Sequence, residues 1–103
     1  MGGITQPELA AGFGQTMQNV SGSRSSGVTY YNTTPRPIMV YVTGQVAGVN
    51  GDMVGYVDSL LSGRVYSTSS VGLRGTVHLL VPPNSSYQIT TSIFTVEQWV
   101  ELR

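Results

Sequence analysis

Short runs of alternating apolar and polar residues follow one another along most of this chain, from residue 17 to residue 103. The clearest run covers residues 38–46, and its apolar members are Ile38, Val40, Val42 and Val46. Because successive side chains of a strand point to opposite faces, this pattern is typical of a half-buried β-strand. No stretch shows the 3.6-residue period of an amphipathic helix over enough residues to form one. The pattern therefore predicts an all-β fold.

Seven further strands are expected, which makes about eight short strands in total. They cover residues 15–20, 27–33, 53–57, 64–68, 73–81, 87–90 and 95–102. Turn signals separate them at intervals of roughly 8–12 residues, which is the spacing of a sandwich or barrel. Among these signals, Pro82-Pro83-Asn84 cannot continue a hydrogen-bonded ladder and is expected to end the strand before it.

Two places in the chain are candidate tight turns. Asn50-Gly51 is a preferred centre of a two-residue type I′ hairpin, in which both central positions need a positive φ. We therefore expect residues 53–57 to return alongside residues 38–46. Residues 57–61 form the one patch with an ambiguous pattern, and we interpret them as a tight turn.

The expected fold is a single antiparallel β-sandwich, of jelly-roll or immunoglobulin-like type, that covers residues 17–103. Residues 1–16 contain several glycines and little apolar pattern. We interpret them as an extended N-terminal arm that contacts with neighbouring molecules keep in order. At most one helical turn fits there, at residues 7–11. The candidate interface residues of the arm are Pro7, Leu9 and Phe13.

The chain is poor in charge, which limits its potential partners. Only 10% of its residues are charged, against about 25% in typical soluble domains, and its formal net charge is zero. There is no basic patch, so no nucleic acid is expected as a partner. Charged residues are depleted at the centres of protein interfaces, so this composition favours contacts between subunits. The alternative is a solvated monomer that hydroxyl and amide side chains keep in solution.

The sequence also bears on targeting and on cysteine chemistry. The first residues lack the basic start and apolar core of a signal peptide, and no apolar run approaches the roughly 20 residues that cross a bilayer. We therefore expect synthesis in the cytoplasm and no membrane insertion. Because the chain contains no cysteine, disulfides, thiolate metal sites and cysteine nucleophiles are excluded.

Residues that could support catalysis are few and badly spaced. His78 is the only histidine, and no serine lies in a nucleophile-elbow pattern with which it could act. Glu97 and Glu101 are expected on one face of a strand, about 13 Å apart, beyond the roughly 5–9.5 Å of glycosidase carboxylates. They are better interpreted as solvated or arginine-paired carboxylates. Asp52 and Asp58 add no metal-ligand spacing, so we expect no enzyme, no cofactor and no metal.

The last expected strand has two faces, and either one could be buried. If the face with Val96, Val100 and Leu102 is buried, Trp99 stands outside between charged residues and is a candidate interface residue. Alternatively, the opposite face is buried, or the arm covers Trp99. Tyrosines are candidates for interface contacts or sugar stacking, although most tyrosines in a β-domain simply pack. The tyrosine candidates are Tyr30, Tyr41 and Tyr66.

Several motifs, in a particular order, resemble those of a known family. The motifs are Gly14 to Val20, Arg24, Gly27 to Thr34 with Pro37-Ile38, Val81 to Tyr87, and Trp99 to Arg103. Together they resemble a β-domain found at the C-termini of tail fibres, tail spikes and related structural proteins of tailed bacteriophages and prophages. The chain departs from the family at Met17, where relatives usually have tryptophan, and at Pro35, where they have glycine.

The resemblance implies a structural protein of a phage virion, made in the host cytoplasm and commonly trimeric. Our first hypothesis is a homotrimeric module of the tail tip, baseplate or fibre, which contacts other virion proteins and has host-surface polysaccharide as a further potential ligand. A second hypothesis is a capsid decoration protein, which would cement neighbouring capsid subunits. A third, from a different class, is a stand-alone carbohydrate-binding lectin.

Overall fold

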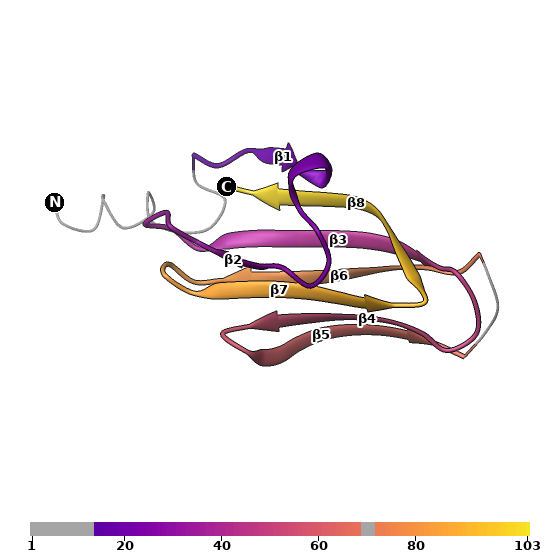
Figure 1. Cartoon of the computed structure of the whole chain (residues 1–103). Coiled ribbons are helices and arrows are strands. Elements are labelled where there is room, and N and C mark those ends of the chain that lie inside the picture. Colours follow the sequence, from indigo (N-terminus) through magenta and orange to yellow (C-terminus); the bar gives the residue numbers. More distant parts are fainter. Residues whose placement is uncertain (1–13, 69–71) are drawn as a thin grey trace, which may run out of the picture.

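Two four-stranded antiparallel sheets pack face to face in the computed structural model, which describes residues 14–68 and 72–103 (Figure 1). Sheet A contains, in spatial order, β1 (Met17–Asn19), β8 (Phe94–Leu102), β3 (Ile38–Val46) and β6 (Arg74–Val81). Sheet B contains β2 (Thr29–Tyr31), β7 (Ser86–Ser92), β4 (Gly51–Val57) and β5 (Leu60–Ser67). A short 3-10 helix, η3 (Ser21–Ser23), lies between β1 and β2. The expected all-β sandwich is confirmed.

The strand order is that of a jelly roll. β1 pairs with β8, β2 with β7, β3 with β6 and β4 with β5, all in antiparallel fashion. The residue numbers of the partners add up to between 117 and 119 along this whole ladder, as for 17 with 102, 29 with 88 and 57 with 60. The described chain is thus one long hairpin wrapped into two sheets. Of the two expected sandwich types, the jelly roll is the one that forms.

The expected hairpin at Asn50-Gly51 is wrong. β3 lies in sheet A and β4 in sheet B, so residues 47–50 connect the two sheets instead of closing a hairpin. Asn50 has a φ of +63°, but Gly51 lacks the positive φ that a type I′ turn also needs. Gly51 is buried at the start of β4, where a Cβ atom would lie 2.3 Å from Cγ2 of Val46. This glycine therefore permits close packing and does not form a two-residue turn.

The two-residue hairpin occurs instead at Asp58-Ser59, within the ambiguous patch at residues 57–61. Val57 pairs with Leu60 across the turn, and the φ angles of Asp58 and Ser59 are +50° and +67°. Positive φ at both central residues is what a type I′ turn requires. The interpretation of this patch as a tight turn is confirmed, and the turn is the centre of the wrapped hairpin.

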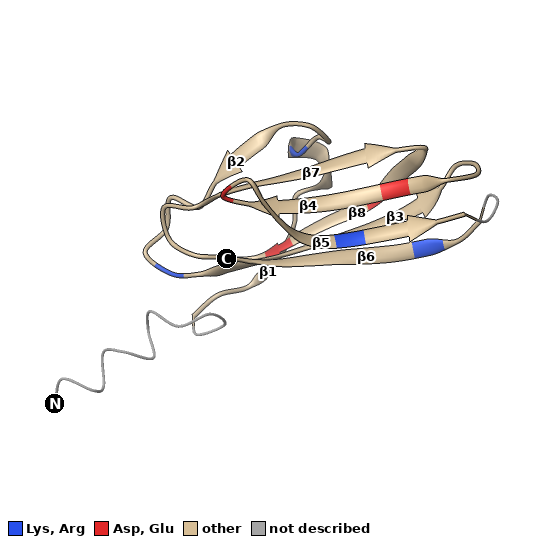
Figure 2. Cartoon of the chain, turned by 90° about the horizontal axis from the view of Figure 1, so that it is seen from below, with Lys and Arg blue, Asp and Glu red and all other residues tan. Residues whose placement is uncertain are grey.

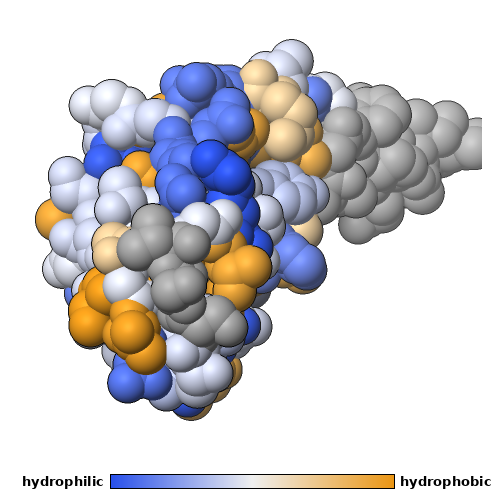
Figure 3. Space-filling view, turned by 90° about the vertical axis from the view of Figure 1, so that its right-hand side faces the viewer, coloured by the Kyte–Doolittle hydropathy of each residue, from blue (hydrophilic) through white to orange (hydrophobic). Residues whose placement is uncertain are grey.

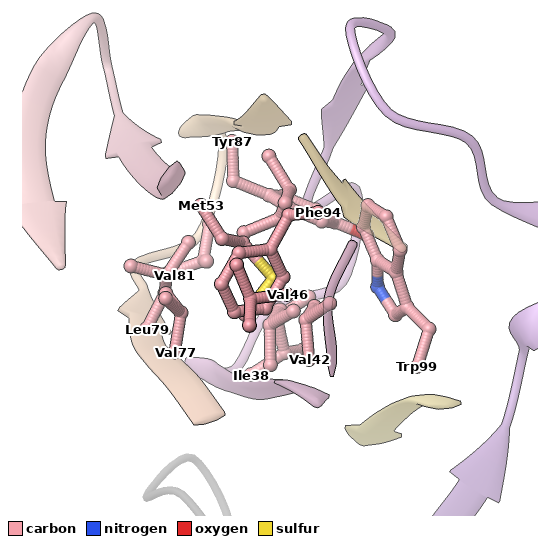
Figure 4. Close-up of a cluster of buried hydrophobic side chains, with 12 residues drawn as sticks. Ile38, Val42, Val46, Met53, Val77, Leu79, Val81, Tyr87, Phe94 and Trp99 are labelled. Atoms are coloured by element: carbon pink, nitrogen blue, oxygen red, sulfur yellow. The ribbon is translucent and has the colours of Figure 1, made fainter. Parts of the chain in front are cut away.

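The core lies between the sheets and follows the alternation in the sequence (Figure 4). Along β3 every second residue is buried, and Ile38, Val40, Val42 and Val46 are all fully buried, as expected. β6 ends directly before the two prolines, as predicted. The other strands contribute Met53, Val77, Leu79, Val81, Tyr87, Ile89, Phe94 and Trp99 to the core.

A β-bulge in β8 interrupts its pairing with β3. Thr43 pairs with Gln98, whereas its neighbour Gly44 pairs with Val96, so Glu97 is an extra residue without a partner on β3. One extra residue reverses the alternation of side chains beyond it. In β8, the positions of the buried side chains therefore alternate in one phase before the bulge and in the opposite phase after it.

Of the two alternatives for Trp99, the one that leaves it exposed as an interface residue is wrong, because the bulge turns this side chain inward. Phe94 faces the core before the bulge, and Trp99, which is 1% exposed, faces it after the bulge (Figure 4). The alternative in which the opposite face is buried applies to this second half of the strand. The expectation that Glu97 and Glu101 share a face is also wrong, since Glu97 is exposed and Glu101 is fully buried.

Candidate assembly surface

A buried carboxylate lies where the first and last strands of the described chain meet. Glu101 on β8 has no exposed surface, and its carboxylate accepts hydrogen bonds from several side chains. Arg24 donates from Nε at 3.1 Å and from Nη2 at 3.2 Å, and Arg103 donates from Nη1 at 3.1 Å. Trp99 donates from Nε1 at 3.2 Å, and Tyr87 donates from its hydroxyl. The expectation of an arginine-paired carboxylate is confirmed for Glu101.

Aromatic side chains surround this carboxylate. The ring of Tyr30 meets that of Trp99 edge-on at a centroid distance of 5.9 Å, and the guanidinium of Arg24 lies 4.7 Å from the Tyr30 ring centre. Burial lowers the pKa of Arg24, but its hydrogen bonds to Glu101 and Tyr87 outweigh this effect and hold the pKa above its usual value. Burial, together with the hydrogen bond to Glu101, raises the pKa of Tyr87 far above its usual value. Arg24 therefore stays charged and Tyr87 stays neutral at physiological pH.

The polar groups of this cluster bond to one another within the chain. In the described part of the chain, every buried side-chain nitrogen and oxygen has a hydrogen-bond partner. A hollow that Tyr87 lines together with Thr29, Tyr56 and Gln88 has a volume of about 30 Å³. Small-molecule pockets are roughly 300–1,000 Å³, so this hollow has room for little more than water. The cluster instead holds the segment before β2 against β8.

The residues considered for catalysis lie in different parts of the sandwich. His78 is exposed on β6 in sheet A, with its ring centre 6.2 Å from that of Tyr41. Asp52 on β4 of sheet B accepts two hydrogen bonds of 3.0 Å from Arg64. Asp58, in the β4–β5 turn, accepts hydrogen bonds at the start of β7. Within residues 14–68 and 72–103, no group of three or more side chains could hold a metal ion.

The outer face of sheet A carries an apolar row that crosses all four of its strands. In the strand register, Met17 is opposite Leu102, Leu102 is opposite Met39, and Met39 is opposite Leu80. Opposite residues of antiparallel strands point to the same face. Met17 is 58% and Leu80 is 54% exposed, while Met39 and Leu102 are half-buried. The four side chains form one continuous surface row.

A second row extends this apolar surface toward the middle of the sheet. Val100, Tyr41 and His78 are opposite one another on β8, β3 and β6. Further along, the face becomes polar and ends near the ion pair between Arg74 and Glu97, whose Nε and Oε1 atoms are 2.8 Å apart. We call the two rows together the sheet A patch; it consists of Met17, Met39, Tyr41, His78, Leu80, Val100 and Leu102. Three of its residues, Met17, His78 and Leu80, are exposed, and the other four are half-buried.

The outer face of sheet B has a different character. Its outward residues are mainly polar or charged: Thr29, Asp52, Arg64, Gln88, Thr90 and Ser92. Val54 and Tyr56 also point outward; Val54 is 7% exposed and Tyr56, opposite Gln88, is half-buried. The large exposed side chains of this sheet lie on its two edge strands and are Tyr31, Leu60, Leu61 and Tyr66. A continuous apolar row across the strands therefore distinguishes sheet A from sheet B.

The end of the sandwich that carries the β3–β4 and β7–β8 connections also exposes apolar side chains. Val49 is 57%, Leu73 is 51% and Ile93 is 51% exposed. Viewed from this end, the hydrophobic colour is divided into separate spots among hydrophilic ones (Figure 3). These residues lie on loops and not in one strand register, so they form a less continuous surface than the sheet A patch.

The aromatic interface candidates from the sequence do not gather at one site. Trp99 is in the core, and Tyr30 is half-buried against it. Tyr66 is 52% exposed on β5, where the guanidinium of Arg64 lies 5.3 Å from its ring centre. Of these candidates, Tyr41 alone belongs to the sheet A patch. The arm candidates Pro7, Leu9 and Phe13 lie outside the described residues.

Sequence reasoning missed most of the sheet A patch. Met39 and Leu80 occupy the outward positions of strands whose inward positions are apolar, so a weak signal was present in the sequence. Met17 and Leu102 come from the first and last strands, far from both in sequence. The register of four strands was needed to place these residues side by side.

Comparisons with protein-family models, curated proteins and solved structures return no match. The resemblance to phage appendage domains is therefore carried by the order of motifs in the sequence alone. The described residues contain no helix that is both long enough and apolar enough to span a membrane.

Proposed function

We propose that this protein is a non-catalytic structural module of a tailed-phage particle, and that the sheet A patch binds a neighbouring virion protein. The observation that carries the proposal is the apolar row of Met17, Leu102, Met39 and Leu80 on the outer face of sheet A. Large exposed apolar surfaces are costly in water, and contact with a partner removes this cost.

Scarce charge also supports an assembly role. Figure 2 shows few charged residues, and most of them form ion pairs within the chain. The pairs are Arg64 with Asp52, Arg74 with Glu97, and both Arg24 and Arg103 with Glu101. A surface with few unpaired charges loses little hydration when a partner covers it. The sheet A patch itself contains no aspartate, glutamate, lysine or arginine.

The family assignment within this proposal rests on the motifs. Arg24, Tyr87, Trp99 and Glu101 come from three separate motifs of the phage-like pattern, and all four meet in the buried cluster. Three of the motifs that carry the resemblance thus supply residues to one buried cluster. Tail tip, baseplate or fibre is our preferred location. The copy number per particle separates this location from capsid decoration, which requires far more copies.

The lectin alternative has weaker support. Sugar-binding surfaces commonly present aromatic rings together, whereas Tyr30, Tyr41 and Tyr66 lie on different strands and faces. Recognition of host-surface polysaccharide therefore stays a secondary part of the proposal. A glycan array with the purified protein tests it directly.

The test is incorporation into particles of the parent phage. The double variant Met17→Gln/Leu80→Gln removes two exposed apolar side chains of the patch, and Tyr31→Gln/Tyr66→Gln is the matched control on sheet B. Burial of one such side chain contributes about 1.5–3 kcal/mol, and 1.4 kcal/mol corresponds to about a tenfold change in affinity. Quantitative mass spectrometry of purified particles should show the patch variant reduced by about tenfold or more. The control should be retained.

Two results would overturn the proposal. Purified particles that contain no copies of the native chain would refute the virion role. Equal incorporation of the patch variant and the native chain would refute the role of the sheet A patch. Thermal unfolding of each variant before the assay separates loss of binding from loss of folding.

A further inference from the structure

Three of the four sheet edges carry features that prevent pairing with another strand. β1 and β2 are only three residues long. β5 has eight residues, but its register against β4 shifts between Gly55 and Tyr56, which marks a bulge. Short strands and bulges protect edges because they interrupt the row of free backbone groups.

β6 is the fourth edge, and it lacks these features. Its eight residues pair with β3 without a break in register, from Arg74 to Val81. It contains neither lysine nor proline, and its arginine is already paired with Glu97. On its other side, β6 has no neighbouring strand of sheet A among the described residues. An uninterrupted, nearly uncharged edge of this length is a template for a further strand.

We propose that β6 pairs with β6 of a second copy of this chain, antiparallel and about a two-fold axis at His78. The pairing joins two copies of sheet A into one continuous sheet. Because the same surface is used by both copies, the contact is closed and ends at a dimer. The zero net charge of the chain means that two copies do not repel each other at long range.

Two conditions select the position of the axis. Opposite residues must point to the same face, so the inward residues Val77 and Leu79 can oppose only inward residues. Of the registers that meet this condition, those with the axis at Val77 or at His78 pair the most residues of β6. The axis at Val77 places Arg74 opposite Leu80. The axis at His78 places Val77 opposite Leu79 and leaves Arg74 beyond the paired segment, so it is the better-matched register.

The adjacent strand of sheet B adds apolar surface to the same flank. β5 and β6 lie side by side there, and a Cβ atom at Gly75 would lie 2.5 Å from Cγ1 of Val65 (Figure 2). At the start of β5, Leu60 is 71% and Leu61 is 58% exposed. A second copy along this flank approaches these leucines as well as the edge of β6. The outer face of sheet A remains uncovered, so the dimer does not compete with the proposed function.

Single cysteines test the register, because the chain has no cysteine of its own. With the axis at His78, two copies of His78→Cys place their Cα atoms about 4.5–5.5 Å apart, which suits a disulfide. Thr76→Cys and Leu80→Cys place theirs about 13 Å apart, too far for a bridge. Under mild oxidation, the His78→Cys protein should give a covalent dimer of twice the 11.0 kDa chain mass, and the other two should stay monomeric on a non-reducing gel.

A charge exchange tests the same contact without oxidation. His78→Lys alone and His78→Asp alone each place like charges across the axis and should shift the dimer to monomer in light scattering. Their mixture places opposite charges there and should restore the dimer. Thr90→Lys, on a central strand of sheet B, is the control that leaves the native mass unchanged. Circular dichroism of each variant checks that it is folded.

Three results would overturn the inference. The first is a light-scattering mass of one or three chains for the native protein over a range of concentrations. The second is cross-linking of Thr76→Cys or Leu80→Cys in place of His78→Cys. The third is a charge mixture that stays monomeric. A mass of three chains would favour the trimer that the family resemblance implies. None of these results bears on particle incorporation, so failure of the dimer is distinguishable from failure of the proposed function.

Discussion

At the scale of single residues, Glu101 is a charged side chain that has no contact with solvent. A fully buried carboxylate is tolerated only where charges and hydrogen-bond donors compensate its lost hydration. Here Arg24 and Arg103 supply the charge, and Trp99 and Tyr87 supply further donors. Since Arg24 precedes β2 and Glu101 lies on the last strand, the pair joins parts of the chain that are 77 residues apart.

Removal of this carboxylate should destabilise the protein strongly. Glu101→Ala leaves two arginines partly buried without their partner, and breaking a buried pair costs about 3–5 kcal/mol. Urea unfolding followed by Trp99 fluorescence measures the change in free energy of unfolding. Glu97→Ala is the control on the same strand, and it should have a much smaller effect because its ion pair with Arg74 is exposed. Equal losses for the two variants would contradict this account.

Asp58 gives the fold a pH dependence. Hydrogen bonds from the Ser85 hydroxyl and the Ser86 N–H lower the pKa of Asp58 below its usual value. A carboxyl with a lowered folded-state pKa stabilises the fold above its unfolded pKa of about 3.9, and this contribution is lost as the pH falls through the folded pKa. Melting temperatures of the native chain and Asp58→Asn should therefore differ most near neutral pH and converge in acid. A difference that is constant with pH would refute this.

At the scale of elements, the β4–β5 turn uses residues that are not ideal for its geometry. Ser59 has a φ of +67°, a left-handed conformation that costs roughly 1–2 kcal/mol for residues other than glycine. The alternation in the flanking strands and their pairing impose this turn. The preferred Asn-Gly pair lies elsewhere in the chain, where it does not form a hairpin.

Ser59→Gly should therefore stabilise the protein by about 1 kcal/mol, since it relieves the left-handed strain. Chemical unfolding measures the change. Ser92→Gly, in β7 without a positive φ, is the control and should destabilise by roughly 0.5–1 kcal/mol. If both glycines destabilise the protein, the turn is not strained.

At the scale of the whole molecule, the wrapped hairpin brings together residues far apart in the chain. β1 pairs with β8 and β2 with β7, so both sheets need strands from the two ends of the described chain. Such non-local pairs form only after a large loss of chain entropy. The cluster around Glu101 joins the segment between β1 and β2 to β8 through Arg24.

Folding should accordingly be slow for a chain of this size, on a timescale of milliseconds to seconds. Trp99 is the only tryptophan and is buried next to Tyr30 of β2, so its fluorescence reports when the end strands come together. Stopped-flow refolding from urea measures the rate. A microsecond folding phase with the full fluorescence change would contradict this topology-based expectation.

The sequence by itself determined the local features of this protein. Its period-two runs located most of the strands, the two prolines marked the end of β6, and the apolar positions of β3 were the core residues. These features depend on side-chain pattern and backbone restriction within a few residues, so they can be recognised without the fold.

Only the tertiary structure decided which strands are neighbours and which faces are covered. The bulge at Glu97 turned Trp99 inward, and close packing at Gly51 replaced an expected hairpin with a crossing between sheets. The sheet A patch takes its members from four strands. The strand order of sheet A places β6 at an edge, where it pairs only with β3 among the described residues. Register and edge position are properties of long-range pairing, and a local pattern does not contain them.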